Sequence, residues 1–397
     1  MTNFVFISPH FPANYWQFCR ALKDVGINVL GIADTPWAHL PQHVQASLND
    51  YYQVPSLEDG DAVLRAVGFF THRWGKVDWL ESNNEYWLEQ DAWLRTMFHI
   101  TTGPMEDQIG LYKHKSAMKE GYKQAGVPAA RWQLASTLEN AQAFVKTVGY
   151  PIVAKPDSGV GATNVYRISN AQDLAAFFSR LPITPYIMEE YVNGGILSYD
   201  ALIDGQGNPL YETGNLTAGS LMDVVNQGLD SVFMIVPEIA EDLRAIGRRT
   251  VQAFSVKSRL VHFEYFRLFE DHQGLGKKGD IVALEVNMRP SGGVTPDMIN
   301  YAGSVDIYRL WADMVLHDRI WLNPDRNKYY CVFVGRRDTR AYRHSHMDVM
   351  HQYAHRIVMQ ERLPLALSNA MGNDLYLARC INREEADAFI QYVCQGV

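Results

Sequence analysis

Residues 261–293 read VHFEYFRLFEDHQGLGKKGDIVALEVNMRPSGG, and their hydrophobic pattern predicts two strands joined by a polar, glycine-containing loop. Side chains alternate between the two faces of a strand, so one face of both arms is predicted to enter a core. The residues on this apolar face are Val261, Phe263, Tyr265, Leu284, Val286 and Met288. The opposite face carries His262, Glu264, Glu285, Asn287 and Arg289.

The polar face of this hairpin suggests a binding site for a cation. If the hairpin is symmetric about Gly274 and Leu275, Glu264 lies opposite Glu285, where two carboxylates repel unless a cation lies between them. Carboxylate and amide oxygens suit Mg²⁺ that is shared with a phosphate, and a nearby guanidinium can neutralise a phosphoryl group. The alternative is a polar hairpin face that simply meets water.

Composition limits the class of protein. The chain has 397 residues and 47% apolar content, enough for two or three domains. Its net charge of −8 comes without a basic block, which argues against a nucleic-acid partner. No apolar run is long enough to span a membrane, and the N-terminus lacks a secretory signal. The four cysteines show no C-x-x-C spacing and indicate reduced thiols, so we expect a cytoplasmic protein.

The N-terminal region shows the pattern of a β-α-β unit. A strand is predicted at 4–8, a helix at 15–25 and a second strand at 28–32. Open sheets of this kind bind ligands at the carboxyl ends of their strands. Glu85 follows a later predicted strand, and we expect it either to bind substrate or to cap the next helix.

Lysines lie in one further predicted helix and at the end of one further predicted strand. A helix is predicted over 113–128, ending at Gly126, with Lys113, Lys119 and Lys123 expected on a solvated face. A buried strand then ends in Lys155. The loop 158–164 that follows has small residues that let its backbone close over phosphates, although it is no Walker A motif.

The next segments are predicted from turn residues. Residues 185–203 contain two strands separated by Asn193-Gly194-Gly195. Residues 204–236 are rich in turn-forming residues and are predicted to be mainly loop, lining a pocket for a second substrate. A closing α/β stretch follows from residue 321 onward.

Four of these stretches resemble, in order, the ATP-grasp family of carboxylate–amine ligases and biotin-dependent carboxylase subunits. They are K-x-x-M-K with A-G-V-P (115–128), the strand-terminal lysine with its glycine loop (155–164), M-E-E-Y-V (188–192), and F-E-Y followed by L-E-V-N-M-R-P-S-G-G (263–293). The resemblance implies an α/β and α+β chain, in which an ATP-grasp fold is preceded by a small Rossmann-like α/β domain. The implied domains are 1–112, 113–318 with a lid subdomain within 113–190, and a C-terminal α/β subdomain at 319–397.

The resemblance also implies roles for individual residues. Glu264, Glu285 and Asn287 would hold Mg²⁺ (or Mn²⁺), and Arg289 would contact the transferring phosphoryl group. The residues implied in ATP binding are Lys115, Lys155, Ser158, Gly159, Gly161, Glu189, Glu190 and Val192. One departure concerns the ribose, because many members have a glutamate near the position of Ile196 that binds its hydroxyls.

The activity that the resemblance implies is an ATP-dependent ligase. A substrate carboxylate would be activated as an acyl phosphate and attacked by an amine, from an amino acid or small peptide. The default expectation for the assembly is a homodimer. Two alternatives remain. One is carbamoyl-phosphate or carboxyphosphate chemistry. The other is a non-catalytic nucleotide-binding protein, which the missing ribose-binding glutamate favours and the complete metal-binding set opposes.

Overall fold

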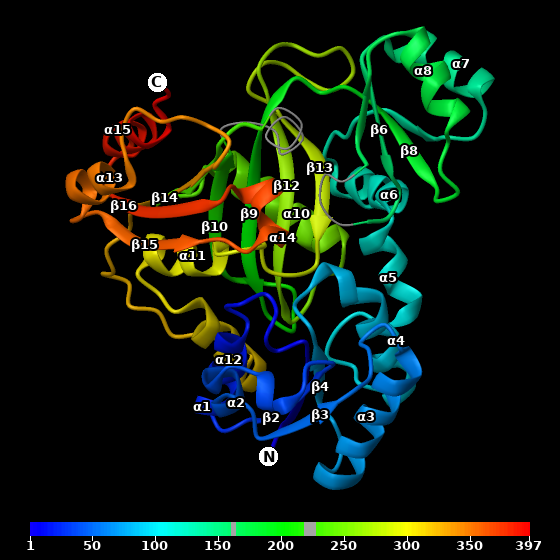
Figure 1. Cartoon of the computed structure of the whole chain (residues 1–397). Helices are drawn as coiled ribbons and strands as arrows, with labels where there is room; N and C mark the ends of the chain where they lie inside the picture. Colours follow the sequence, from blue (N-terminus) through cyan, green and yellow to red (C-terminus); the bar gives the residue numbers. More distant parts are fainter. Residues whose placement is uncertain (160–163, 218–227) are drawn as a thin grey trace.

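The computed structural model describes residues 1–159, 164–217 and 228–397. The described strands form three sheets, which occupy different parts of the molecule (Figure 1). No helix in these ranges is long and apolar enough to cross a membrane.

The first sheet is the N-terminal one, and its four strands are parallel in the order β3-β2-β1-β4. Its strands are β1 (Asn3–Ile7), β2 (Asn28–Ala33), β3 (Asp50–Gln53) and β4 (Trp79–Glu81). Its helical segments are α1 (Trp16–Asp24), η1 (Trp37–His39), α2 (Gln42–Ala46), α3 (Gly60–Trp74), η2 (Glu85–Trp87) and α4 (Leu88–Phe98). Every residue of β1 is buried, as expected for a parallel strand covered on both faces. The predicted Rossmann-like α/β unit is therefore confirmed.

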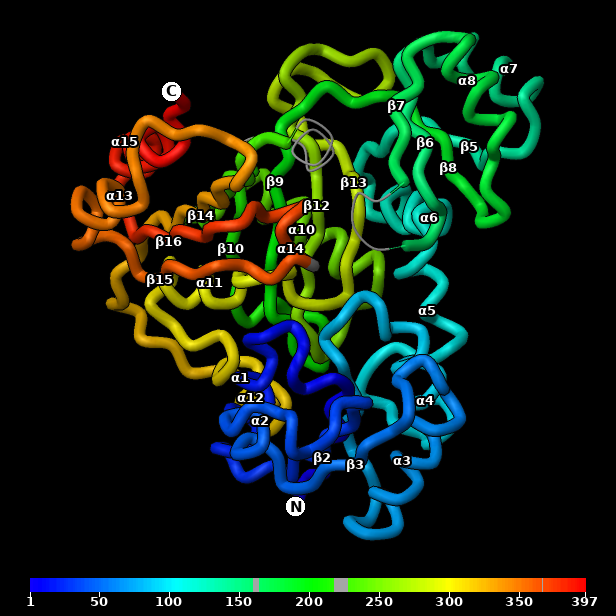
Figure 2. The backbone as a smooth tube through the Cα atoms, viewed as in Figure 1, coloured from blue at the N-terminus to red at the C-terminus, as the bar shows by residue number. Residues whose placement is uncertain are grey.

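A second, smaller sheet lies at the upper right in Figure 2 and is antiparallel, in the order β5-β8-β6-β7. Its elements are β5 (Trp132–Leu134), α7 (Leu138–Val148), β6 (Ile152–Pro156), β7 (Tyr166–Ile168), α8 (Ala171–Ser179) and β8 (Tyr186–Glu190). Phe144, Leu174 and Phe177 of the two helices pack on Met188 and other strand residues in a core of their own. This part of the chain is thus a compact unit.

The third sheet has eight antiparallel strands in the order β13-β12-β9-β10-β11-β14-β16-β15. They are β9 (Gly194–Ile203), β10 (Pro209–Thr217), β11 (Ser231–Ile235), β12 (Arg259–Leu268), β13 (Ile281–Asn287), β14 (Tyr330–Arg336), β15 (Ile357–Arg362) and β16 (Asp374–Cys380). The prediction that 204–236 is mainly loop is wrong, because β10 and β11 lie within it; its residues 218–227 are outside the described ranges. Strands β14, β15 and β16 belong to the same sheet as β9 to β13, so this sheet continues across the predicted domain boundary at residue 318.

The remaining helices connect and cover these sheets. They are α5 (Glu106–Lys113), α6 (Lys115–Ala125), α10 (Glu241–Ala253), α11 (Thr295–Gly303), α12 (Ile307–His317), α13 (His346–Tyr353), α14 (Leu365–Met371) and α15 (Arg383–Cys394). Helix α12 packs on the N-terminal sheet, where the Trp311 ring meets Phe4 edge-on at 5.4 Å. The segment after β13 therefore returns to the N-terminal sheet.

The single helix predicted over 113–128 is two helices that meet at His114. His114 has an extended conformation, with φ −92° and ψ 119°. Asp157, just after β6, holds the new helix start: its Oδ1 accepts from Ser116 N at 2.8 Å and its Oδ2 from Ser116 Oγ at 2.9 Å. Helix α6 then ends at Gly126, whose φ of 62° is left-handed, as the sequence predicts.

Candidate functional site

The hairpin of β12 and β13 has the register that the sequence predicts. Glu264 lies opposite Glu285, and His262 lies opposite Asn287. The register then shifts by one residue between Glu264 and Tyr265, which pairs with Ala283. This irregularity corrects one prediction: Ala283 is 1% exposed in the core, whereas Leu284 is only half-buried.

Protein cations accompany the two facing carboxylates. Lys115 Nζ lies 3.1 Å from Glu285 Oε1. His262 Nε2 lies 3.2 Å from Glu264 Oε1, and its Nδ1 lies 2.8 Å from Asp200 Oδ1. Burial alone would lower the pKa of His262, but Asp200 and Glu264 outweigh it and raise this pKa to about 9. The imidazolium in turn lowers the pKa of Glu264 against the effect of burial. Glu264 is therefore stabilised as a carboxylate, and Glu285 has Lys115 as its partner.

The chemistry of the hairpin face fits a divalent cation that is shared with a ligand. The Glu264 and Glu285 side chains are 31% and 23% exposed, and the Asn287 amide oxygen accepts from Arg289 Nη2 at 3.3 Å. Among the described residues, no three or more His, Cys, Asp or Glu side chains are grouped as a metal site. Mg²⁺ usually takes one or two carboxylates and completes its shell with water and phosphate oxygens, so this donor set suits it.

Three buried side chains form a second group beside the hairpin. Lys155 ends β6, and its Nζ lies 2.6 Å from Glu189 Oε2. The other oxygen of Glu189 forms an ion pair with Lys119 of α6. Burial opposes ionisation of Glu189, yet the two lysine charges lower its pKa to about 2.

The burial of Lys119 overturns the prediction that it lies on a solvated face, because it is 6% exposed. The sequence contained a usable signal. Lys115 and Lys119 are four residues apart, so they share one face of a helix, and Lys115 was already a candidate. Lys123 is exposed, as predicted.

A third group links the N-terminal sheet to Arg289. Lys113, also predicted to be solvated, is buried and donates from Nζ to the Glu85 carbonyl oxygen at 2.9 Å. Its Nζ also lies 3.3 Å from Glu85 Oε1, and Arg289 Nε lies 3.6 Å from Glu85 Oε2. Glu85 is not the helix cap, because the Asn84 side chain accepts from Tyr86 N instead. The Glu85 carboxylate thus faces two cations.

The other predicted nucleotide-binding residues lie around the small sheet. Glu190 points to the face of β8 opposite Glu189, and its carboxylate accepts from Arg131 N at 2.7 Å and Arg131 Nε at 2.8 Å. Val192 is buried just after β8, whereas Ser158 and Gly159 are exposed. Gly161 lies outside the described residues. The Glu190 side chain is therefore bound to Arg131, at the start of the small sheet.

A buried ion cluster fixes the N-terminal sheet against this hairpin. Glu81 Oε2 accepts from Arg95 Nη2 and Arg259 Nη2, each at 2.8 Å. Arg259, the first residue of β12, also donates to the Met288 carbonyl oxygen at 2.7 Å. Because Met288 directly precedes Arg289, this cluster sets where the arginine lies relative to the N-terminal sheet.

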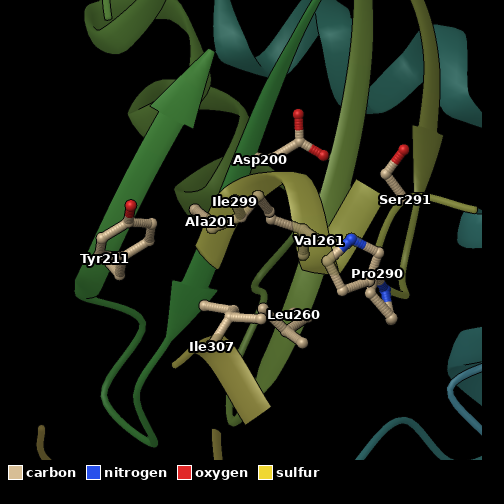
Figure 3. Close-up of a pocket in the computed structure, with 10 residues that line it drawn as sticks. Asp200, Ala201, Tyr211, Leu260, Val261, Pro290, Ser291, Ile299 and Ile307 are labelled. Atoms are coloured by element: carbon tan, nitrogen blue, oxygen red, sulfur yellow. The ribbon is translucent and has the colours of Figure 1, made fainter. Parts of the chain in front are cut away.

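A small pocket lies against β9, β12 and α11 (Figure 3). Its polar side chains are Asp200, Tyr211 and Ser291, and the rest of its lining is apolar: Ala201, Leu260, Val261, Pro290, Pro296, Ile299 and Ile307. Asp200 therefore lies between an apolar lining and His262. Such surroundings strengthen the attraction between Asp200 and the imidazole, which offsets the lowering of the His262 pKa by burial.

Comparison with known proteins agrees with this architecture. No protein-family model matches the chain. It is 23% identical over 309 residues to the L-arginine-specific L-amino acid ligase of Bacillus subtilis, covering 75% of this chain and 70% of that protein.

Solved structures show the same fold over almost the whole chain. An L-amino acid ligase from Bacillus licheniformis matches with a TM-score of 0.72 at 16% identity, over 98% of this chain and 96% of that one. The biotin carboxylase domain of a Hydrogenobacter thermophilus 2-oxoglutarate carboxylase, solved with MgADP and bicarbonate, matches with a TM-score of 0.70 at 16% identity, over 98% and 89%. With its three sheets, the chain has the fold of the ATP-grasp ligases, and its ordered series of lysines, glutamates and Asn287-x-Arg289 resembles theirs.

Proposed function

We propose that the chain is a Mg²⁺- and ATP-dependent ligase that joins a carboxylate to an amine and releases ADP and phosphate. The observation that carries the proposal is the hairpin, where Glu264 lies opposite Glu285 and Asn287 and Arg289 follow on the same strand. Lys115 extends to this hairpin from α6. The names of the similar L-amino acid ligases support the same chemistry.

Nucleotide binding is the first task that the residues would perform. Lys115 and Lys155 would hold phosphate oxygens, and the backbone of Glu189 and Val192 would meet the adenine edge. Glu264, Glu285 and Asn287 would hold Mg²⁺, which would supply neutralisation of phosphate charge. Phosphoryl transfer depends mainly on such alignment and electrostatics, which this set of charged groups would provide.

Arg289 would contact the phosphoryl group while it is transferred from ATP to the substrate. A substrate carboxylate oxygen attacks the γ-phosphorus, the bond to the β-phosphate oxygen breaks, and ADP leaves with that electron pair. The guanidinium stabilises the charge on the moving phosphoryl group. An amine then attacks the acyl carbon, loses a proton and expels phosphate, which leaves an amide. Loop 158–164 would exclude water from the acyl phosphate, and this role remains a prediction.

We further propose that the substrates are an amino acid and a second amino acid or small peptide, because two similar proteins are named L-amino acid ligases. We also propose that the protein is a cytoplasmic homodimer without a nucleic-acid or membrane partner.

ADP release tests this proposal directly. The chain is incubated with MgATP and pools of amino acids, dipeptides and small organic acids, and active pools are examined by mass spectrometry. ADP together with a product whose mass equals two substrates minus water supports the ligase. ADP that appears only with bicarbonate supports carboxyphosphate chemistry instead. Bound ATP without ADP from any pool favours a non-catalytic nucleotide-binding protein.

A further inference from the structure

Lys119 is a buried cation to which the resemblance assigns no role. It extends from α6 to one oxygen of Glu189, while Lys155 holds the other oxygen at 2.6 Å. The side chains of Lys119, Glu189 and Lys155 are only 4%, 7% and 8% exposed. A single carboxylate is therefore shared by two ammonium groups in an environment nearly free of water.

The charges of this group do not balance. Lys115 is paired with Glu285, and His262 is paired with both Asp200 and Glu264. Glu189, in contrast to Glu264 and Glu285, has two lysine partners. A buried charge is costly unless an opposite charge accompanies it, and within the triad of Lys119, Glu189 and Lys155 two ammonium groups share one carboxylate.

The electrostatics identify which lysine is less well matched. Burial lowers the pKa of Lys119 in spite of Glu189, and the nearby charge of Lys155 lowers it further. Burial acts in the same direction on Lys155, but there Glu189 and Glu285 prevail and raise the pKa. An additional anion near both amines would therefore stabilise Lys119 most.

We propose that Lys119 is a third phosphate-binding lysine of the nucleotide site, which Glu189 holds in place until a polyphosphate arrives. The inference rests on the proposed function and gives a role to the second lysine of K-x-x-M-K, to which the resemblance assigns none. Lys119 shares a face of α6 with Lys115 and shares a carboxylate with Lys155, the two lysines proposed to bind ATP. A phosphate oxygen would replace a Glu189 oxygen as its partner.

The competing explanation is that Lys119 only neutralises Glu189. A single lysine is enough for that purpose, and Lys155 already provides it at 2.6 Å. The two explanations predict different dependence on the ligand's charge. A phosphate-binding lysine matters for ATP and ADP but not for adenosine, whereas a purely structural lysine affects all three alike or none of them.

The test compares Lys119→Met with Lys123→Met, which removes an exposed lysine one turn further along the same helix. Affinities for ATP, ADP and adenosine are measured by calorimetry on the whole chain with Mg²⁺. We expect Lys119→Met to weaken ATP and ADP binding about 10- to 100-fold, the range of a charge-assisted hydrogen bond, and to leave adenosine unchanged. Lys123→Met should bind all three like the wild type, and Lys119→Arg should recover part of the loss.

Two results would overturn the inference while the proposed ligase stands. They are wild-type ATP affinity in Lys119→Met, and an equal loss for ATP and adenosine. A wild-type chain that binds no ATP would overturn the proposed function and the inference together. Should Lys119→Met fail to fold, the double variant Lys119→Met/Glu189→Gln removes both members of the ion pair, and the same loss of ATP affinity relative to Glu189→Gln is expected.

Discussion

Glu81 and Glu189 are buried glutamates that each bind two cations, yet their surroundings differ. Glu81 accepts from Arg95 and Arg259, and Glu189 pairs with Lys119 and Lys155. The arginines also donate to backbone carbonyls: Arg95 to those of Leu80 and Pro104, and Arg259 to that of Met288. The lysines meet their glutamate from two separate elements, α6 and β6.

The difference teaches what each cluster is suited to do. A guanidinium whose planar fork also donates to a backbone carbonyl cannot leave its carboxylate without disturbing that bond. An ammonium on a flexible stem is a point charge that can exchange one oxygen for another. We interpret the arginine cluster as a permanent joint between the N-terminal sheet and β12, and the lysine cluster as an exchangeable binding site.

The largest effect should come from the hairpin that lies between these clusters. Glu285→Ala and Arg289→Ala should each lower kcat by about 10³-fold or more, since both remove charge that stabilises phosphoryl transfer. ADP release measures the loss, and circular dichroism should show an unchanged fold. Full turnover in either variant would contradict the assigned site. Lys123→Met is the control and should remain active.

The second prediction concerns Arg259 in the arginine cluster around Glu81. Arg259→Met leaves Glu81 with one cation and the Met288 carbonyl without its donor, so the free energy of unfolding should fall by about 3–5 kcal/mol. Urea unfolding gives this value. Lys119→Met should lose less, because a lysine makes no comparable set of carbonyl bonds. The comparison of clusters fails if Lys119→Met is the more destabilising of the two.

The cluster of Lys119, Lys155 and Glu189 should make a contribution to the free energy of unfolding that depends on pH. The pKa of Glu189 is lowered to about 2 in the folded chain, below its usual value of 4.5. Its contribution, on the order of 3 kcal/mol, is therefore fully present above about pH 4.5 and is lost as the pH falls towards 2. Glu189→Gln should flatten the stability profile in that window. A profile that stays as steep as that of the wild type would show that other carboxylates dominate it.

A smaller effect is expected at Glu85, which connects the N-terminal sheet to Arg289 across 3.6 Å. Glu85→Gln removes the charge that holds the guanidinium, so kcat should fall about tenfold while the KM for ATP changes little. Glu89→Gln, an exposed neighbour, is the matched control. A change confined to KM would instead place Glu85 in binding.

The sequence predicted the hairpin well because its information is local. A period of two residues and a symmetric loop bring Glu264 opposite Glu285, and the pairing confirms this. The one-residue irregularity that follows was not predictable, since it involves a single extra residue, Leu284, without a glycine to mark it.

Features set by distant contacts were missed. The break between α5 and α6 depends on Asp157, 41 residues beyond Ser116. Burial of Lys113 and Lys119 depends on Glu85 and Glu189, which come from other elements. Strand β10 buries Thr213 and Asn215 within the large sheet, so its polar sequence resembled a loop.

The contact of Arg131 with Glu190 has a consequence for how such chains can be recombined. Arg131 N donates to Glu190 Oε1 at 2.7 Å and Glu190 N donates to the Arg131 carbonyl at 3.0 Å, so the chain enters and leaves the small sheet at one place. A segment with adjoining ends and its own core has the geometry of a transplantable module. A chain that exchanged residues 131–190 with a relative would join the backbone at one place and would need to keep the contacts of Asp157 and Glu189 with α6.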